Sequence, residues 1–404
     1  MTPASVMITG IGVVSPLGCS VAELTRRFAA GERAVTVLDV AEVDGAHGAV
    51  VAEIPLDGAP PPVQRRLGRF DRISRLFLAA SCLAVDAAAL DMSAEDGERV
   101  GVSFGTGLGC LLTNAAYNQR LVEAGPAAAS PQLFAYTVSS AAAGEVSIAL
   151  GVRGANVTMH AGLAAGLAAI GYGVDLIRLG KADVVLAGGA DALGPALLQG
   201  LEAMALLKRG AATPFVDAVP GVVPGEAAVI VVLESAAHAA ARGARVWAAI
   251  EGHAAGFEPT LTRPDRTSAG IESTLRRALG AAGRSGSGVD VVLCSAHGTP
   301  VDAVEQAALA ALCGGASPLP LVLAPKAAVG ECFGASGPLG LALAVGLCAA
   351  PPAAVAEGLA LEVTENGVRP AARVAARLGR TRAALIHNVC YSGPSLAMVV
   401  ATPE

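Results

Sequence analysis

The chain has 404 residues, of which 53% are hydrophobic and 15% are charged, so a large and well-covered core is expected and disorder is excluded. A net charge of −6 and an aromatic content of 3% exclude a basic nucleic-acid face and a base-stacking platform. The eight cysteines are scattered without metal-ligand spacing, which is typical of reduced thiols in a cytoplasmic protein. We therefore expect neither a nucleic-acid partner nor a metal.

Strand signals recur along the chain, and each ends in glycine or a turn. The continuous apolar runs lie at residues 5–12, 99–107, 182–191, 227–235, 246–254, 289–299, 320–326, 383–393 and 396–402. Runs without polar alternation are typical of strands that helices cover on both faces. Helical stretches such as 71–90 and 270–282 lie between these runs, so we predict an α/β layered fold.

Two windows imitate membrane spans. Residues 155–174 and 332–356 contain no charged side chain, but both are rich in glycine and alanine and neither has a flanking basic cluster. We predict buried helices, the first entered through Gly162 with Leu163 in its first turn. The N-terminus has no basic region followed by an apolar run, so we expect no signal peptide, no membrane partner and a cytoplasmic location.

Glycine clusters at residues 105–110 and 9–14 invite a nucleotide-binding interpretation. "GTGLGC" follows a strand but lacks the last glycine of the dinucleotide fingerprint, and "TGIGVV" is no closer to it. Tight turns at strand ends explain both clusters more simply. We expect no cofactor.

The chain also carries a loose internal repeat. Residues 99–107 and 289–299 occupy similar places in the two halves, as do the two uncharged helices that open near Leu163 and Glu331. This pattern predicts a duplicated unit with halves 1–240 and 241–404.

Several motifs in order resemble the β-ketoacyl synthases of the thiolase superfamily. The resemblance is carried by "VMITGIGVVSPLG" at the N-terminus, "RLGRFDRISRLFLAASCLAVDAA", "PFVDAVPGVVPGEAAVIVVLE", "AHGT" and "PKAAVGECFGASG". It covers nearly the whole chain and implies a five-layered αβαβα fold built from two duplicated halves.

The resemblance also implies a catalytic pocket, and here the chain departs from the family. The family places a nucleophilic cysteine at a buried helix start, assisted by two histidines. The cysteine position falls on Leu163 and the second histidine on Glu331, while His297 and Lys326 match the family's first histidine and lysine. A leucine forms no thioester, so we interpret the pocket as non-catalytic. Cys294 and Cys332 lie away from the helix start and are expected to be buried small hydrophobes.

A synthase without its nucleophile resembles the chain-length factor, or β-subunit, of a type II polyketide synthase. This resemblance implies an active ketosynthase partner in a heterodimer and an acyl carrier protein that presents the chain. The tunnel-lining positions would be Leu111, Leu112, Asn114, Ala115, Asn118, Leu133 and Phe134. Either of the last two is expected to reach into the partner's cavity, with ordinary interface packing as the alternative.

Chain-length factors for aromatic polyketides often carry glutamine where this chain has Leu163. An apolar wall suits a hydrocarbon chain and leaves the carbonyl groups of a poly-β-ketone unpaired, so a reduced or polyene product is favoured over an aromatic one. Two other functions stay open. One is a residual decarboxylase or acyltransferase that uses the altered pocket, and the other is a homodimeric scaffold.

Overall fold

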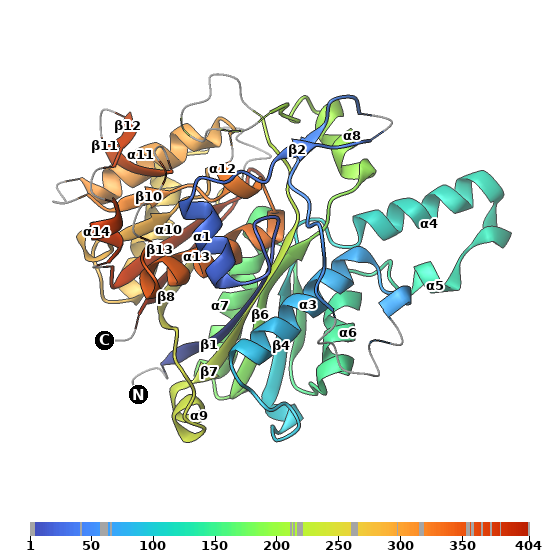
Figure 1. Cartoon of the computed structure of the whole chain (residues 1–404), viewed down its shortest axis with the longest axis horizontal. Helices are drawn as coiled ribbons and strands as arrows, with labels where there is room; N and C mark the ends of the chain where they lie inside the picture. Colours follow the sequence, from blue (N-terminus) through green and yellow to red (C-terminus); the bar gives the residue numbers. More distant parts are fainter. Residues whose placement is uncertain are drawn as a thin grey trace.

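The computed structural model of the chain is shown in Figure 1. It describes residues 5–40, 43–56, 64, 67–210, 212, 215, 221–259, 266–296, 298–314, 319–352, 356, 359–364, 367–371, 374–379 and 381–402.

Two sheets with the same strand order form the frame. The first half orders its strands as β1 (Val6–Val14), β7 (Ala227–Ser235), β6 (Val184–Asp191), β4 (Val100–Gly105) and β5 (Asn156–Met159). The second half repeats this order with β8 (Ala248–Phe257), β14 (Pro394–Ala401), β13 (Ala383–Val389), β9 (Val291–Leu293) and β10 (Leu321–Leu323). Parallel and antiparallel pairings also correspond between the halves, which confirms the predicted duplication. A short pairing of β1 with β8 joins the two sheets.

Helices separate and cover the sheets in five layers (Figure 1). The middle layer contains α7 (Ala165–Arg178) and α13 (Ser336–Ala349). The outer layers contain α3 (Arg72–Ala87) and α6 (Ala141–Leu150) on the first half, and α10 (Ser268–Ala281) and α11 (Val301–Cys313) on the second. This is the predicted thiolase-like αβαβα arrangement.

Strand β6 shows why the apolar runs are continuous. Val185 and Ala187 pack into the middle core with α7 and α13, whereas Val184 and Leu186 pack into the outer core with α3 and α6. Successive side chains of a strand point to opposite faces of the sheet, and here helices bury both faces. The same alternation divides the strands of the second half between the middle core and the core beneath α10 and α11.

The remaining elements are short or peripheral. The helices are α1 (Val21–Ala29), α4 (Leu111–Ala124), α5 (Pro131–Phe134), α8 (Pro195–Ala203), α9 (Ala236–Ala241), α12 (Lys326–Val329) and α14 (Val374–Leu378). Single 3-10 turns are η1 (Leu67–Arg69), η2 (Gly97–Arg99), η3 (Pro126–Ala128), η4 (Gly162–Ala164), η5 (Gly286–Gly288) and η6 (Phe333–Ala335). Two hairpins complete the chain, made by β2 (Thr36–Val37) with β3 (His47–Gly48) and by β11 (Ala360–Thr364) with β12 (Gly367–Pro370).

All nine predicted strands are present, and the described residues form five further strands that were not predicted. β5 and β12 are the two edge strands of the large sheet, β11 pairs with β12 at one of these edges, and β2 and β3 form a separate hairpin. Strands at a sheet edge need no continuous apolar run. The two uncharged windows contain α7 and α13, which lie between the sheets as predicted for buried helices. Within the described part of the chain, no helix is long and apolar enough to cross a membrane.

The glycines of "TGIG" allow β1 to pack closely against α3. A side-chain carbon at Gly12 would collide with the carbonyl oxygen of Ala80, and one at Gly10 with that of Ala84. These glycines therefore serve strand–helix packing rather than phosphate binding.

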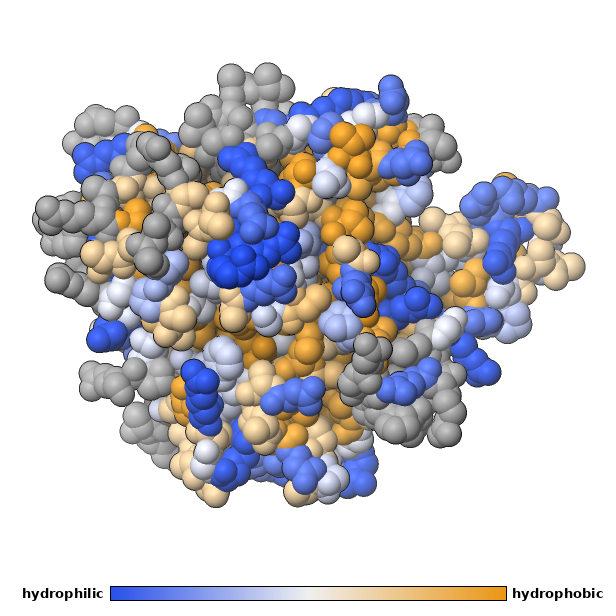
Figure 2. Space-filling model, viewed as in Figure 1, coloured by the Kyte–Doolittle hydropathy of each residue, from blue (hydrophilic) through white to orange (hydrophobic). Residues whose placement is uncertain are grey.

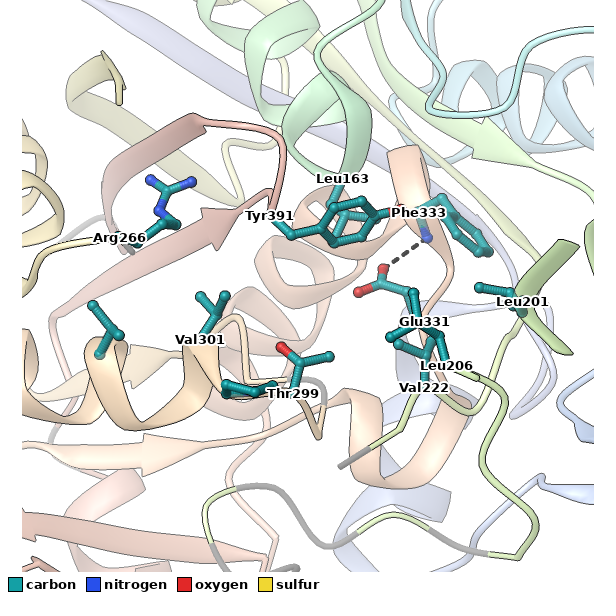
Figure 3. Close-up of a pocket in the computed structure, with 12 residues that line it drawn as sticks. Leu163, Leu201, Leu206, Val222, Arg266, Thr299, Val301, Glu331, Phe333 and Tyr391 are labelled. Atoms are coloured by element: carbon teal, nitrogen blue, oxygen red, sulfur yellow. Dashed lines mark hydrogen bonds between the residues drawn. The ribbon is translucent and has the colours of Figure 1, made fainter. Parts of the chain in front are cut away.

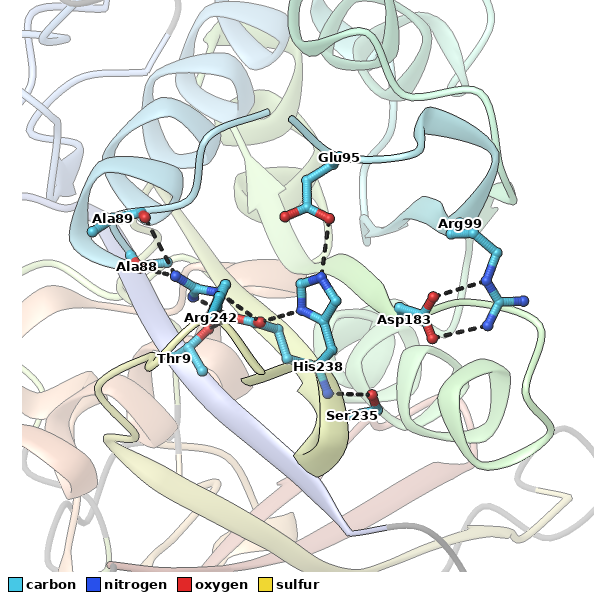
Figure 4. Close-up of polar contacts among 10 residues, drawn as sticks. Thr9, Ala88, Ala89, Glu95, Arg99, Asp183, Ser235, His238 and Arg242 are labelled. Carbon is cyan, nitrogen blue, oxygen red and sulfur yellow. Dashed lines mark hydrogen bonds and ion pairs between the residues drawn. The ribbon is translucent and has the colours of Figure 1, made fainter. Parts of the chain in front are cut away.

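A buried carboxylate organises the corner between β7 and α9 (Figure 4). The side chain of Glu234 is 0% exposed and accepts hydrogen bonds from Thr9 Oγ1 and from Arg242 Nε, the latter at 2.8 Å. His238 Nδ1 lies 2.6 Å from Glu234 Oε2, and its Nε2 lies 3.0 Å from Glu95 Oε2. His238 thus links the loop that carries Glu95 to this corner.

The protonation of His238 is expected to make stability depend on pH. Burial alone would lower the pKa of His238, but hydrogen bonds and charge from Glu234 and Glu95 outweigh it and raise the pKa above the ordinary 6.5. The folded state therefore binds the proton of His238 more tightly than the unfolded state does. The contribution of protonated His238 to the free energy of unfolding is complete below pH 6.5 and is lost as the pH rises through the raised pKa of His238. In urea unfolding at a series of pH values, His238→Gln should remove this decline. An unchanged decline in the variant would contradict the assignment.

Candidate functional site

A cavity of about 480 Å³ lies at the start of α7, where the two halves meet (Figure 3). Most of its wall is apolar, contributed by Leu163, Leu201, Leu206, Val222, Pro300, Val301, Val304 and Phe333. Four polar residues complete the lining, namely Arg266, Thr299, Glu331 and Tyr391. Figure 2 shows apolar side chains gathered over α8 and towards the root of α4. The volume falls within the range of small-molecule sites.

Leu163 occupies the position where the family resemblance places a nucleophile. It lies in η4, immediately before α7, and is 2% exposed. Gly162 has a φ of +55°, and a side-chain carbon there would collide with the sulfur of Cys390, so only glycine fits this turn. Leu163 packs with Phe333 and Cys390 in one apolar cluster. The helix start therefore presents a hydrocarbon side chain to the cavity.

Glu331 lines the same cavity and is 2% exposed, at the start of the segment that leads into η6 and α13. Its Oε1 accepts hydrogen bonds from Phe333 N at 2.8 Å and from Ser336 Oγ at 2.6 Å. Its Oε2 lies 2.7 Å from Nζ of Lys326, so the two side chains form an ion pair. Lys326 Nζ also donates to Ser295 Oγ at 3.4 Å. These contacts compensate the burial of both charges.

The chemistry available in this cavity is therefore limited. Among the described residues that line it, none carries a thiol or an imidazole. His297 lies outside the described residues, so its match to the family's first histidine stays a prediction. In the part of the chain that the structure describes, no group of His, Cys, Asp and Glu is arranged to hold a metal ion.

Cys294 and Cys332 are buried, as expected from the sequence. Burial raises the pKa of the Cys294 thiol and of the Cys332 thiol well above the ordinary 9.0. Neither is a thiolate near neutral pH, and neither lines the cavity. Cys390 was not considered from the sequence; its sulfur packs against Gly162, lies 3.0 Å from Ser392 Oγ and is also buried.

Sequence analysis missed Arg266, whose side chain is 2% exposed beside the cavity. Its Nη1 donates to the carbonyl oxygens of Cys390 and Pro394, and its Nη2 lies 3.4 Å from Glu258 Oε2. Burial lowers the pKa of Arg266 from its ordinary value. Two of its partners are backbone carbonyls from a distant strand pair, and such partners leave no side-chain pattern in the sequence.

Asp191 is a second residue that sequence analysis missed. This fully buried carboxylate accepts hydrogen bonds from Thr106 Oγ1 at 2.6 Å and from the backbone N–H groups of Gly107, Leu108 and Gly334. Burial raises the pKa of Asp191 to about 6. Asp191 therefore ties the loop before α4 in the first half to η6 in the second half.

Helix α4 and the short α5 project from the body as an arm (Figure 1). Within α4, only Thr113 is buried. Leu111 packs against the apolar cluster that contains Leu163, whereas Leu112 packs against the outer core beneath α3. The arm thus begins at the cavity and extends away from it.

The other predicted tunnel positions lie along this arm. Asn114 donates through Nδ2 to the sulfur of Cys110 at 3.1 Å, and Asn118 is exposed one turn further on. Phe134 is 61% exposed, and its ring lies 5.9 Å from that of Tyr117. Ala115 and Leu133 are half-buried. Of the seven predicted positions, Leu111 alone packs against the Leu163 cluster. The tunnel role of all seven stays a prediction.

Comparison with known proteins agrees with this architecture. Residues 4–239 match the family described as "Beta-ketoacyl synthase, N-terminal domain", and residues 247–349 match "Beta-ketoacyl synthase, C-terminal domain". The chain is 32% identical to the 3-oxoacyl-[acyl-carrier-protein] synthase 2 of Rhizobium meliloti (strain 1021), over 82% of this chain and 83% of the relative. It is 31% identical to the tetracenomycin polyketide synthase ketoacyl synthase alpha subunit of Streptomyces glaucescens, over 83% of each.

A solved structure shares the whole fold. It is described as "The ishigamide ketosynthase/chain length factor" and superposes with a TM-score of 0.86 at 26% identity, covering 100% of both chains. The first family match includes all five strands of the first sheet and α7, and the second includes β8, β9, β10 and α13. The chain therefore belongs to the β-ketoacyl synthase family.

Proposed function

We propose that this chain is a chain-length factor, the non-catalytic subunit that pairs with an active ketosynthase and shapes the tunnel for a growing polyketide chain. The observation that carries the proposal is Leu163 at the start of α7, in one cavity with Glu331. A side chain without a lone pair accepts no acyl group from a carrier protein. Condensation would then belong to the partner subunit.

Restoring the thiol alone is expected to leave the chain inactive. In Leu163→Cys, the thiol would lie at a helix start, but Glu331 would remain where the family uses a neutral hydrogen-bond donor. A carboxylate there repels the malonyl carboxylate and does not stabilise an enolate oxygen. Incubation of the variant with acyl- and malonyl-carrier protein, followed by mass spectrometry, should detect no condensation product. Condensation by this single variant would contradict the proposal that the site is non-catalytic.

The surface of the arm supports pairing with a second subunit. Val122 and Phe134 are 86% and 61% exposed on the arm, and Val138 before α6 and Ile148 within α6 are also exposed. Strand β5 lies at the end of the sheet, and in the described part of the chain no strand pairs with its outer edge. Exposed apolar side chains beside an open sheet edge are typical of a surface that another chain covers.

The heterodimer is tested by co-expression with a candidate ketosynthase. A complex with the mass of one copy of each chain is expected from native mass spectrometry. A stable dimer of this chain alone, with no ketosynthase bound, would favour a homodimeric scaffold. An acyl carrier protein would present the chain to this complex. Carrier proteins are acidic and this chain has a net charge of −6, so the partner subunit is expected to provide the main docking surface.

The apolar wall favours a reduced or polyene chain as the product. The cavity wall contains eight apolar residues, and Leu111 continues that apolar cluster to the root of α4. Such a surface stabilises hydrocarbon and leaves the carbonyl oxygens of a poly-β-ketone without donors. Product analysis of the reconstituted pair distinguishes this product from an aromatic polyketide.

Enlarging Asn118 is expected to shorten the product. The side chain is exposed on the arm, so a tryptophan is tolerated by the fold but occupies the predicted tunnel. We expect Asn118→Trp to shift the products of the reconstituted pair to shorter chains, as measured by mass spectrometry. Gln119→Trp, at the next exposed position of the same helix, is the matched control and should leave the distribution unchanged. Equal behaviour of the two variants would remove Asn118 from the tunnel.

A residual decarboxylase or acyltransferase is the alternative, because a cavity of about 480 Å³ remains open at the altered site. The isolated chain is incubated with acyl- or malonyl-carrier protein, and covalent acyl mass and released carbon dioxide are measured. Neither is expected. Turnover by the chain alone would overturn the non-catalytic assignment while leaving the heterodimer test intact.

A further inference from the structure

A second hollow, of about 730 Å³, lies on the outer side of the molecule and shares no lining residue with the Leu163 cavity. It is bounded by α1, by the C-terminal end of α13 and by the segment that enters β8. Figure 1 shows α1 lying beside α13 on the face towards the viewer. Nothing in the proposed chain-length role uses this hollow.

Small side chains create the space between the two helices. At Gly346, a side-chain carbon would collide with Thr25 Oγ1, so α1 and α13 approach closely there. Beyond this contact, Ala349 and Ala350 are exposed and the helices leave the hollow open. The half-buried Trp247 also lines it and packs against the middle core. The wall is thus apolar and aromatic.

Both charged residues that line the hollow are arginines. Arg26 is 68% exposed and lies 4.0 Å from Glu32, but Glu32 is engaged more closely by Arg27 at 2.7 Å. The guanidinium carbon of Arg245 lies 5.0 Å from the centroid of the Trp247 ring. Among the described residues that line the hollow, none is acidic. The hollow therefore joins a positive rim to an apolar wall.

We propose that this hollow binds a medium-chain alkyl carboxylate. The carboxylate would be held by Arg26 and Arg245, because a guanidinium–carboxylate contact combines charge with paired hydrogen bonds. The alkyl chain would lie against the alanines of α1 and α13 and against Trp247, where the removal of each methylene group from water favours binding. An alkyl cation would meet two like charges, and a small anion without a chain would leave the wall uncovered. This charge pattern selects an amphipathic anion.

Trp247 is the only tryptophan in the chain, so its fluorescence reports on this hollow without labelling. Titration of the full chain with decanoate, below its micelle concentration, should give a saturable change in emission. Decyltrimethylammonium, with an alkyl chain one carbon longer and the opposite charge, should give none. The absence of saturation with decanoate, or an equal response to the cation, would overturn the proposal.

Three variants separate the carboxylate site from nonspecific binding. Arg26→Gln should weaken decanoate binding about tenfold, as expected for the loss of one charge-assisted contact. Arg153→Gln is the matched control, because this arginine is also 68% exposed and lies 3.9 Å from a single carboxylate, that of Asp96. Ala349→Leu should abolish binding by filling the hollow from an exposed position. Equal affinity in Arg26→Gln and Arg153→Gln, or unchanged affinity in Ala349→Leu, would place decanoate elsewhere.

Discussion

The Lys326→Met variant should lower the free energy of unfolding by about 3–5 kcal/mol, as expected when one partner of a buried ion pair is removed. Lys326 is 5% exposed and Glu331 is 2% exposed, and Nζ lies 2.7 Å from Oε2. Methionine keeps the volume of the lysine stem, so the loss reports mainly on the uncompensated carboxylate. Urea unfolding followed by Trp247 fluorescence measures it.

A double variant provides the control. Glu331→Gln retains an oxygen that accepts from Phe333 N and Ser336 Oγ but carries no charge. Added to Lys326→Met, it should recover most of the lost stability, because no buried charge then remains unpaired. If the double variant were as unstable as Lys326→Met, packing of the lysine stem rather than the ion pair would account for the loss.

The Arg242→Met variant should lower the free energy of unfolding by about 3 kcal/mol, because it also leaves a buried carboxylate without its cationic partner. Arg242 donates from Nε and Nη2 to the fully buried Glu234, at 2.8 and 2.5 Å (Figure 4). Burial raises the pKa of Glu234, but Arg242, Thr9 and His238 outweigh it and lower the pKa below the ordinary 4.5. The contribution of ionised Glu234 to the free energy of unfolding is therefore complete above pH 4.5. It is lost as the pH falls through the lowered pKa of Glu234.

Arg99 in the same region is the matched comparison. It forms two hydrogen bonds with Asp183, each of 2.9 Å, but their side chains are 40% and 39% exposed. Exposed pairs of this kind are worth less than about 1 kcal/mol, so Arg99→Met should change stability little. A similar loss in Arg99→Met and Arg242→Met would show that burial of Glu234 is not the deciding factor.

Much of the layered fold was predictable because its causes are local. Strands covered on both faces need an apolar side chain at nearly every position, and all nine strands predicted from such runs are present. The missed strand β5 has the sequence "NVTM" and no buried residue, because it lies at the sheet edge. Its pairing with β4 is set by its neighbour rather than by its own composition.

The residues of the candidate site likewise include some that were predicted from the sequence and some that were missed. Leu163 and Glu331 were found by position within motifs, and the structure places both in one cavity. Asp191 and Arg266 were missed because most of their partners are backbone groups from distant segments. Gly334 lies 143 residues from Asp191, and the Cys390 carbonyl lies 124 residues from Arg266. A hydrogen bond to a backbone atom places no demand on the identity of the residue that supplies it.

The sequence by itself determined the repeated α/β layers, because continuous apolar runs specify strands that are covered on both faces. Its motifs, through their resemblance to a known family, also indicated the family and the aliphatic residue at the helix start. Only the tertiary structure decided how the buried charges pair, that the altered pocket stays open, and that a second hollow lies between α1 and α13. These features depend on how closely distant segments approach one another, which packing of the whole core sets.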